Sequence, residues 1–101
     1  GMPEYMLESV LVHELTHQWQ HENLGGYDCE DEGDKRYIEG HAVCIEIQYL
    51  EKLNEYPEYV RRQKESSDPI YGAGYRLVIE EMEELGLNSS FELLKQKFPK
   101  K

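Results

Sequence analysis

Two histidines and a glutamate occupy one turn of a predicted helix, in the pattern His13-Glu14-Leu15-Thr16-His17. Residues four apart lie on the same helix face, about 6 Å apart along the axis, so both imidazoles can reach one tetrahedral zinc ion at about 2.0–2.1 Å. Glu14 is rotated about 100° from His13, beside the metal, where its carboxylate can take a proton from a water molecule. The pattern therefore predicts His13 and His17 as zinc ligands and Glu14 as general base. Alternatively, the histidines are polar residues on an exposed face, but they interrupt apolar positions, which favours an inward orientation.

A catalytic zinc site needs a third protein ligand. Gln20 and Asn23 stand where the metzincin pattern requires glycine and histidine, so that class is excluded. His21 continues the line of the two histidines by one more turn. Three ligands along one helix would span about 12 Å, too far for a single ion. The third ligand is therefore expected from a second helix.

Glu39 is the candidate on that second helix, and Gly40 after it is small enough to let two helices approach closely. The interval from His17, 39 − 17 = 22 positions, accommodates a loop and a return. Alternatively, Glu39 is an ordinary first-turn acid favoured by the helix dipole. His41 and Glu46 are weaker candidates. Glu46 lies two turns beyond Glu39 on the same face, where it would either orient a ligand or, as we expect, remain solvated.

Helices are expected to position these residues, because apolar residues recur at helical spacing through most of the chain. The predicted helices run over residues 3–21, 37–53, 58–65, 76–85 and 90–98. The predicted apolar face of the first helix consists of Met6, Val10, Leu11, Leu15 and Trp19.

The connections carry turn and cap signals. The stretch 23–35 is rich in glycine and acidic residues and is expected to be a loop, and 71–75 is expected to be a turn. Gly86 is expected to end the fourth helix, and Ser90 to cap the last. The fold class expected is all-α, a compact bundle of four to five helices around the His13–His17 helix, without a convincing strand.

Composition limits the function further. The 101 residues fit one domain, 2–101, with Gly1 expected to be a residue left by tag removal. A net charge of −10 repels phosphate backbones, so nucleic acid is not expected as a partner. Apolar stretches are far shorter than the roughly 20 residues of a membrane span, so no membrane partner is expected. Without a secretory pattern, Cys29 and Cys44 are expected to be reduced thiols of a cytoplasmic protein.

The histidine motif followed by Glu39-Gly40 resembles the gluzincin metallopeptidases, whose third zinc ligand is a glutamate on the next helix. The run Glu-Ser-Ser-Asp-Pro-Ile-Tyr-Gly-Ala-Gly-Tyr-Arg at 65–76 is similar to a segment of the peptidase domain of the plant LIM-associated growth regulators, the DA-one family. There a serine-rich approach leads into Pro-Val-Tyr-Gly-Asp-Gly-Phe-Arg. Trp19 and the final helix after Gly86 also match that pattern. The resemblance covers residues 11–94 and implies a gluzincin-type zinc metalloendopeptidase in minimal form, acting on peptide or protein substrates.

The sequence also departs from that family. Ile38-Glu39 leaves one acid where the family has an acidic pair. Gluzincins usually carry a small sheet before the metal helix, whose edge strand binds the substrate backbone, but here only the eleven residues 2–12 precede His13. The implied fold is therefore the gluzincin helical core without most of its N-terminal sheet. Either a partner chain supplies the substrate-binding strand, or the domain is a helical remnant with a poor cleft.

Some minigluzincins of similar length are held latent by their own C-terminal segment. Residues 90–101 could do the same here, although an ordinary packing helix is the expectation. The alternative function is a zinc-binding but catalytically silent, or latent, interaction domain. A third option is a helical adaptor without metal.

Tyr71 is the candidate for a second catalytic group. Attack on a peptide carbonyl develops negative charge on its oxygen, and a preorganised donor there typically contributes about 10²–10³ in rate. A phenol can donate without carrying charge, and the glycines beyond it let the backbone approach the metal. Arg76 would hold a substrate carboxylate or brace an acid such as Asp68. Alternatively, the glycines only make a turn, and Tyr71 and Tyr75 fill the core.

Overall fold

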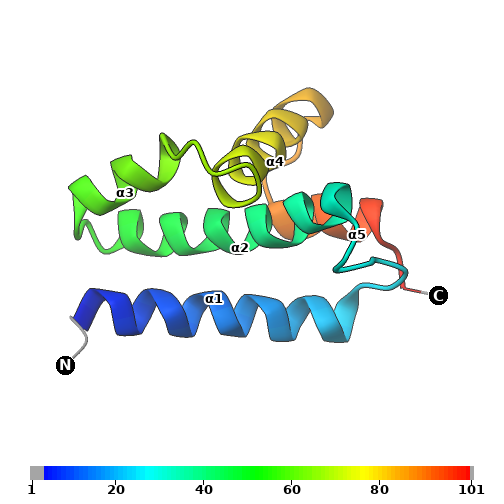
Figure 1. Cartoon of the computed structure of the whole chain (residues 1–101), viewed down its shortest axis with the longest axis horizontal. Helices are drawn as coiled ribbons and strands as arrows, with labels where there is room; N and C mark the ends of the chain where they lie inside the picture. The colour runs from blue at the N-terminus through cyan, green and yellow to red at the C-terminus, as the bar shows by residue number, and fades with distance from the viewer. Residues whose placement is uncertain (1–3, 101) are drawn as a thin grey trace.

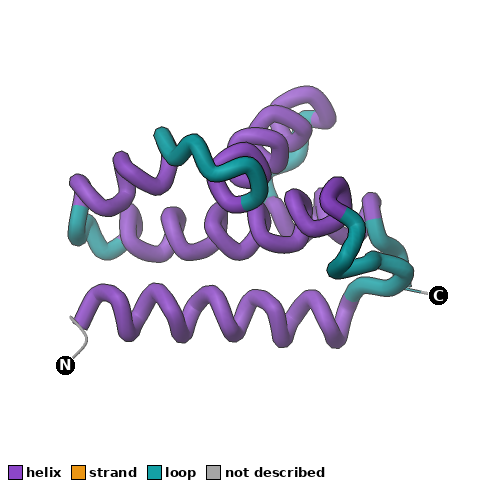
Figure 2. The backbone as a smooth tube through the Cα atoms, viewed as in Figure 1, coloured by secondary structure: helices purple, strands orange, loops and turns teal. Residues whose placement is uncertain are grey.

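The structure is a computed structural model that describes the backbone of residues 4–100 and the side chains of residues 7–100. Within this range five helices follow one another (Figures 1 and 2): α1 (Glu4–Asn23), α2 (Glu32–Lys52), α3 (Pro57–Lys64), α4 (Tyr71–Leu85) and α5 (Ser90–Lys97). The described residues contain no strand, only an isolated antiparallel bridge between Leu24 and Pro99. The all-α expectation is therefore confirmed.

The central helix is α2, which packs against each of the other four helices. α1 lies antiparallel along one side of α2, and α3 and α4 lie on the opposite side (Figure 1). The core divides into two clusters that both include α2. The larger joins α2 to α4 and α5, and the smaller joins α2 to α3. The radius of gyration, 13.3 Å, is close to the roughly 13 Å expected for a folded domain of this length.

The buried face of α1 is polar, contrary to the sequence expectation. Ser9, Thr16 and Gln20 are buried against the neighbouring helices. The side chains expected in the core, Val10, Leu11 and Leu15, are instead 47%, 58% and 59% exposed. Trp19 is half-buried against the larger cluster, and the side chain of Met6 lies outside the described residues. The apolar pattern therefore identified the helix correctly but gave the wrong inward face.

α2 begins at Glu32, five residues before the predicted start at Tyr37. The Asp31 side chain accepts a hydrogen bond from the Asp34 amide and caps the helix, and acidic residues in the first turn suit the positive end of the helix dipole. The N-terminus of α2 therefore lies inside the stretch 23–35, whose acidic and glycine-rich composition predicts a loop.

α4 begins at Tyr71, so the expected turn over 71–75 is wrong. The Asp68 carboxylate accepts hydrogen bonds from the amides of Ile70 and Tyr71, which satisfies amides at the helix start. Both glycines of the run lie where there is no room for a side chain, because a Cβ on Gly72 would meet backbone of the 66–68 loop and one on Gly74 would meet backbone of α2. The glycines therefore serve close packing within a helix.

A very close approach between two helices joins Gly40 on α2 to Gly74 on α4. A Cβ built on Gly40 would lie only 2.2 Å from the Gly74 carbonyl carbon. Gly40 thus allows close helix packing as predicted, but its partner is α4 rather than α1, the helix of His13 and His17. This crossing brings the start of α4 toward the residue before Gly40, which is Glu39.

The C-terminal part packs as an ordinary core element. Gly86 ends α4 in the left-handed conformation, with φ of 67°, as predicted. The cap of α5 is Ser89, one residue before the predicted Ser90, and its side chain accepts from the Phe91 amide. Leu93 and Leu94 are fully buried in the larger cluster, which agrees with the expectation of a packing helix.

Two further findings concern composition. None of the helices in residues 4–100 is long and apolar enough to cross a membrane. Both cysteines are free thiols, as expected, with Cys29 exposed and Cys44 buried.

Candidate metal centre

The two histidines of α1 face α2. His13 and His17 are half-buried, and their ring centroids lie 4.7 Å apart in an edge-to-face arrangement. Glu14, one residue round the helix, is exposed. The local geometry of one helical turn therefore places the two imidazoles together and the carboxylate to their side, as the spacing predicts.

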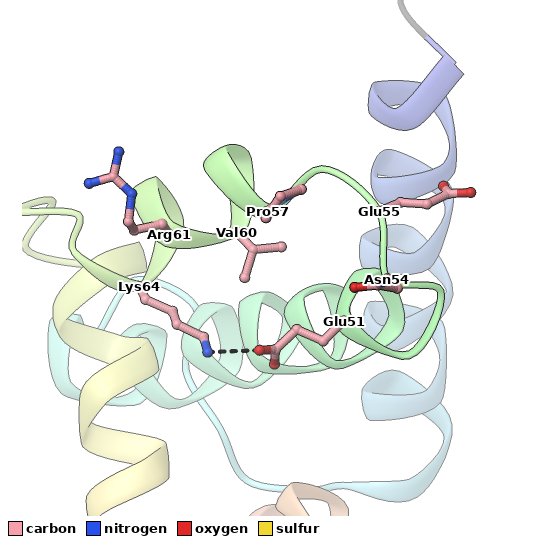
Figure 3. Close-up of a pocket in the computed structure, with 7 residues that line it drawn as sticks. All are labelled: Glu51, Asn54, Glu55, Pro57, Val60, Arg61 and Lys64. Atoms are coloured by element: carbon pink, nitrogen blue, oxygen red, sulfur yellow. Dashed lines mark hydrogen bonds and ion pairs between the residues drawn. The ribbon is translucent and has the colours of Figure 1, made fainter.

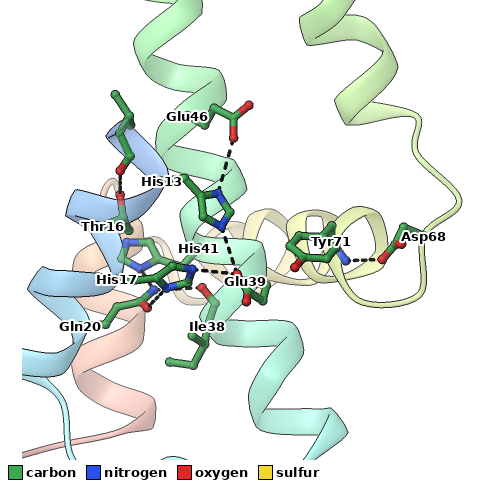
Figure 4. A network of polar contacts seen from close by, with 11 residues as sticks. His13, Thr16, His17, Gln20, Ile38, Glu39, His41, Glu46, Asp68 and Tyr71 are labelled. Carbon is green, nitrogen blue, oxygen red and sulfur yellow. Dashed lines mark hydrogen bonds and ion pairs between the residues drawn. The ribbon is translucent and has the colours of Figure 1, made fainter. Parts of the chain in front are cut away.

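α2 contributes Glu39 to the same point. Its Oε1 lies 3.1 Å from His13 Nε2 and 2.9 Å from His17 Nε2 (Figure 4). Each of the three residues offers one ligand atom, and these atoms lie within 4.8 Å of one another. His13, His17 and Glu39 could therefore hold a metal ion, and we call them the metal group. His21 is exposed and does not belong to this group, nor does the buried His41. The structure thus brings together the three residues that the sequence nominated as ligands.

This group suits zinc in its chemistry, and the two donor separations that involve Glu39 also suit it in size. Two imidazole nitrogens and one carboxylate oxygen are the ligand set of a catalytic zinc site with a fourth position left for water or substrate. Tetrahedral ligands at about 2.0–2.1 Å are separated from one another by about 3.3 Å. The observed separations from Glu39 Oε1 to the two Nε2 atoms are within a few tenths of an ångström of that value.

The electrostatics of the group favour a cation between these atoms. The hydrogen bond to Glu39, supported by Glu46, outweighs desolvation and raises the pKa of His13 to about 9. The pKa of His17 is also raised, mainly by its hydrogen bond to Glu39. Burial would raise the pKa of Glu39, but the hydrogen bonds from both histidines outweigh it and lower the pKa to about 2. An ionised carboxylate held between two imidazoles attracts either protons or a metal cation.

Each histidine also has a polar partner at its other ring nitrogen. His13 Nδ1 lies 3.6 Å from Glu46 Oε2, and Glu46 Oε1 accepts a 2.5 Å hydrogen bond from the Tyr59 hydroxyl on α3. Glu46 is only 6% exposed. The expectation that Glu46 is solvated is therefore wrong. It is buried because α3 covers it. The residues next to Glu46 in the sequence do not reveal that α3 packs there.

Gln20 is the partner of His17, and sequence reasoning missed it. Its Oε1 lies 2.7 Å from His17 Nδ1, and its side chain is almost fully buried. On the opposite side, Gln20 Nε2 lies 2.9 Å from His41 Nδ1. Burial lowers the pKa of His41 to about 4, which keeps this imidazole neutral near pH 7. The spacing of three residues from His17 is the sequence signal that could have identified Gln20, because it places both on one helix face.

A small cavity of about 180 Å³ adjoins the metal group on the side of His13. It is lined by residues of α1, α2 and α3: Ser9, Val10, His13, Glu14, Glu46 and Tyr59. Glu14 therefore borders the same cavity as His13, one of the candidate metal ligands. A general base has to lie this near to the water that it deprotonates. No residue of α5 lines this cavity. The structure therefore gives no support to the idea that the C-terminal helix blocks the cavity.

Tyr71 lies near the metal group, at the start of α4. Its ring centroid is 6.3 Å from that of His13, and the negative charge of Glu39 raises its pKa. Tyr71 is 41% exposed, so it does not fill the core, whereas Tyr75 is partly buried against both core clusters. Figure 4 shows Tyr71 on the α4 side of Glu39, across from the histidines.

Among the described residues Arg76 does not brace Asp68, whereas its other expected role, holding a substrate carboxylate, stays a prediction. Its Nη1 donates hydrogen bonds to the carbonyl oxygens of Lys64 and Ser66, at 3.2 and 2.8 Å. Arg76 therefore fastens the loop between α3 and α4 and braces no acid.

A larger cavity of about 350 Å³ lies between the end of α2 and α3 (Figure 3). Its lining includes the ion pair between Lys64 Nζ and Glu51 Oε2, 2.9 Å apart, but no residue of the metal group. The larger of these two cavities is therefore not the one beside the His13–His17–Glu39 group.

No family model matches the sequence, and neither a curated protein nor a solved structure matches it significantly. The resemblance to gluzincins therefore rests on the sequence motifs alone.

Proposed function

We propose that this chain is a zinc-dependent metallopeptidase domain of the gluzincin kind, with His13, His17 and Glu39 as ligands. The observation that supports the proposal most is the convergence of both histidine Nε2 atoms on one carboxylate oxygen of the neighbouring helix, at 3.1 and 2.9 Å. When bound, zinc would lower the pKa of a coordinated water to about 7 and polarise the scissile carbonyl.

The side chains around this group have the roles that peptide hydrolysis needs. Glu14 accepts the proton of the attacking water and returns it to the leaving amine, a role typically worth about 10²–10⁴ in rate. The cavity beside His13 and Glu14 would receive part of the peptide. Tyr71 donates a hydrogen bond to the carbonyl oxygen as negative charge develops there.

The proposal includes a polypeptide that covers α1 and supplies the strand for the substrate backbone. Among the described side chains of α1, four large apolar ones are exposed, including Leu11 at 58% and Leu15 at 59%. Leu11 and Leu15 lie one turn apart on the same helix face, and exposed apolar surface of this kind typically marks a site of protein contact. The strand could come from a partner chain or from the substrate protein itself.

The metal and the chemistry are tested in two steps. Protein purified without added zinc should contain one zinc per chain by elemental analysis, and Glu39→Ala should lose it, whereas His21→Ala should keep it. Full zinc occupancy in Glu39→Ala would refute the ligand assignment. Glu14→Gln should then keep zinc while cleavage of a peptide library falls by about 10²-fold or more.

The alternative of a catalytically silent zinc domain gives a different result in the same experiment. In that case wild type and Glu14→Gln bind zinc equally, and neither cleaves any library peptide. Activity of Glu14→Gln at the wild-type rate would instead contradict the proposed base.

A further inference from the structure

Both polar atoms of the buried Gln20 side chain make hydrogen bonds, and one of these bonds is to His17 of the metal group. Its Oε1 lies 2.7 Å from His17 Nδ1, and its Nε2 lies 2.9 Å from both the Ile38 carbonyl oxygen and His41 Nδ1 (Figure 4). Gln20 is 1% exposed and His41 is fully buried. A buried amide with every contact on protein atoms has little freedom to rotate.

The Ile38 carbonyl fixes which way the amide points. A carbonyl oxygen only accepts hydrogen bonds, so the Gln20 atom facing it must be the nitrogen. The nitrogen has two protons, and it donates one to Ile38 O and the other to His41 Nδ1. The oxygen of Gln20 therefore faces His17 Nδ1 and can only accept, so His17 must carry a proton on Nδ1.

We infer that Gln20 is a positioning residue of the metal centre, which selects the Nδ1–H form of His17 and holds its Nε2 lone pair toward the ion. The inference rests on the proposed zinc centre. His41 acts only through Gln20, because it is the second acceptor that keeps the amide in this orientation. In metal sites, residues that hydrogen-bond to a ligand histidine fix its tautomer and the orientation of its ring.

The main test is zinc affinity, measured by competition with a chelator. Gln20→Met keeps the length of the side chain and removes all three hydrogen bonds. Loss of such a partner typically weakens metal binding about 10–100-fold, and we expect a loss in this range. The matched control is Gln18→Met. Gln18 lies on the same helix, is exposed, and bonds only Glu22 at 2.9 Å, so this variant should bind zinc like wild type.

A second measurement separates positioning from a general loss of structure. In ¹⁵N-histidine NMR spectra of the wild type, the His17 Nδ1–H should be protected from solvent exchange with and without zinc. It should lose this protection in Gln20→Met and keep it in Gln18→Met. The backbone amide spectrum of each variant reports whether the fold is retained.

The role of His41 is tested by a double-mutant cycle. His41→Leu should weaken zinc binding in the wild-type background and have no further effect in the Gln20→Met background, because its influence passes through Gln20. Additive losses would refute this dependence.

These measurements distinguish failure of the proposed zinc centre from failure of the positioning role of Gln20. If the wild type binds zinc and a folded Gln20→Met binds it equally tightly, the positioning role is refuted and the zinc centre stands. If the wild type binds no zinc while the His17 Nδ1–H is protected, the zinc centre and the positioning role are both refuted, and only the hydrogen bond remains. Weaker binding in Gln20→Met with an unprotected Nδ1–H and normal binding in Gln18→Met supports the inference.

Discussion

At the scale of residues, the candidate site depends on both nitrogens of each imidazole. The two Nε2 atoms converge on Glu39 Oε1, and the two Nδ1 atoms face the buried side chains Gln20 and Glu46. A histidine that is merely polar on a helix surface needs only one such partner, or water. Partners on both sides restrict the ring to one orientation, which is the requirement of a metal ligand.

Tyr71 gives the first prediction at this scale. Replacing Tyr71 by Phe removes the hydroxyl and keeps the ring near His13, so zinc content and stability should be unchanged. If the hydroxyl stabilises the developing negative charge, kcat should fall by about 10²–10³ with little change in KM. The measurement is steady-state cleavage of the best library peptide. The control is Tyr49→Phe, an exposed tyrosine outside the cavity beside His13. Equal kcat in wild type and Tyr71→Phe would contradict a catalytic role.

Among the helices, α2 and α4 meet at one close crossing beside the candidate site. Gly40 packs against Gly74, and this contact sets the distance between Glu39 on α2 and the start of α4. Because backbone meets backbone here, neither side can adjust by changing a rotamer. The crossing therefore fixes where the start of α4, with Tyr71, lies relative to Glu39.

Gly40→Ala tests this crossing. The added Cβ would lie 2.2 Å from the Gly74 carbonyl carbon, so the helices must separate. Overpacking costs typically about 1–3 kcal/mol, and we expect the upper part of this range in urea unfolding. Gly33→Ala, exposed in the same helix, should change stability by less than about 1 kcal/mol. A Gly40→Ala protein as stable as the wild type would show that the crossing is looser than described.

The orientation of α1 gives another prediction at the same scale. Leu11→Gln and Leu15→Gln alter exposed side chains, so each should change the free energy of unfolding by less than about 0.5 kcal/mol. The comparison is Leu94→Ala in the fully buried core, which should cost about 2–5 kcal/mol. A large loss in the α1 variants would mean that the apolar face of α1 is buried, as the sequence pattern alone predicts.

At the scale of the whole molecule, Cys44 reports on the integrity of the core. It is fully buried within the cluster that joins α2, α4 and α5, whereas Cys29 is exposed in the loop after α1. A thiol reagent should therefore label Cys29 in the folded protein and reach Cys44 only on unfolding.

The same thiol predicts how stability changes at alkaline pH. Burial raises the pKa of Cys44 from 9.0 to about 11, so between these values the folded chain keeps a proton that the unfolded chain loses. Unfolding is then favoured as pH rises, and about 2 kcal/mol of stability should be lost by pH 11. Urea unfolding at pH 8 and 10.5 should show a smaller decrease for Cys44→Ala than for wild type. Parallel decreases in the two proteins would contradict this assignment.

Several features of this chain depend only on neighbours within one or two helical turns, and these can be predicted from the residues alone. The all-α class, the pairing of His13 with His17, and the left-handed end of α4 at Gly86 all follow from local spacing or from a single residue type. These features need no partner from elsewhere in the chain. Glu39 was nominated by elimination, and its contact with the two histidines appears only in the folded structure.

Features that depend on which helix faces meet appear only in the folded structure. It buried the polar face of α1 and exposed Leu11 and Leu15, because Gln20 finds its hydrogen-bond partners on α2. It buried Glu46 under α3 and turned the glycine run before Tyr75 into helix, because Gly74 fits against α2 and no larger residue would. Periodicity gives the face of a helix that is apolar, but the face that is buried depends on contacts between residues distant in sequence.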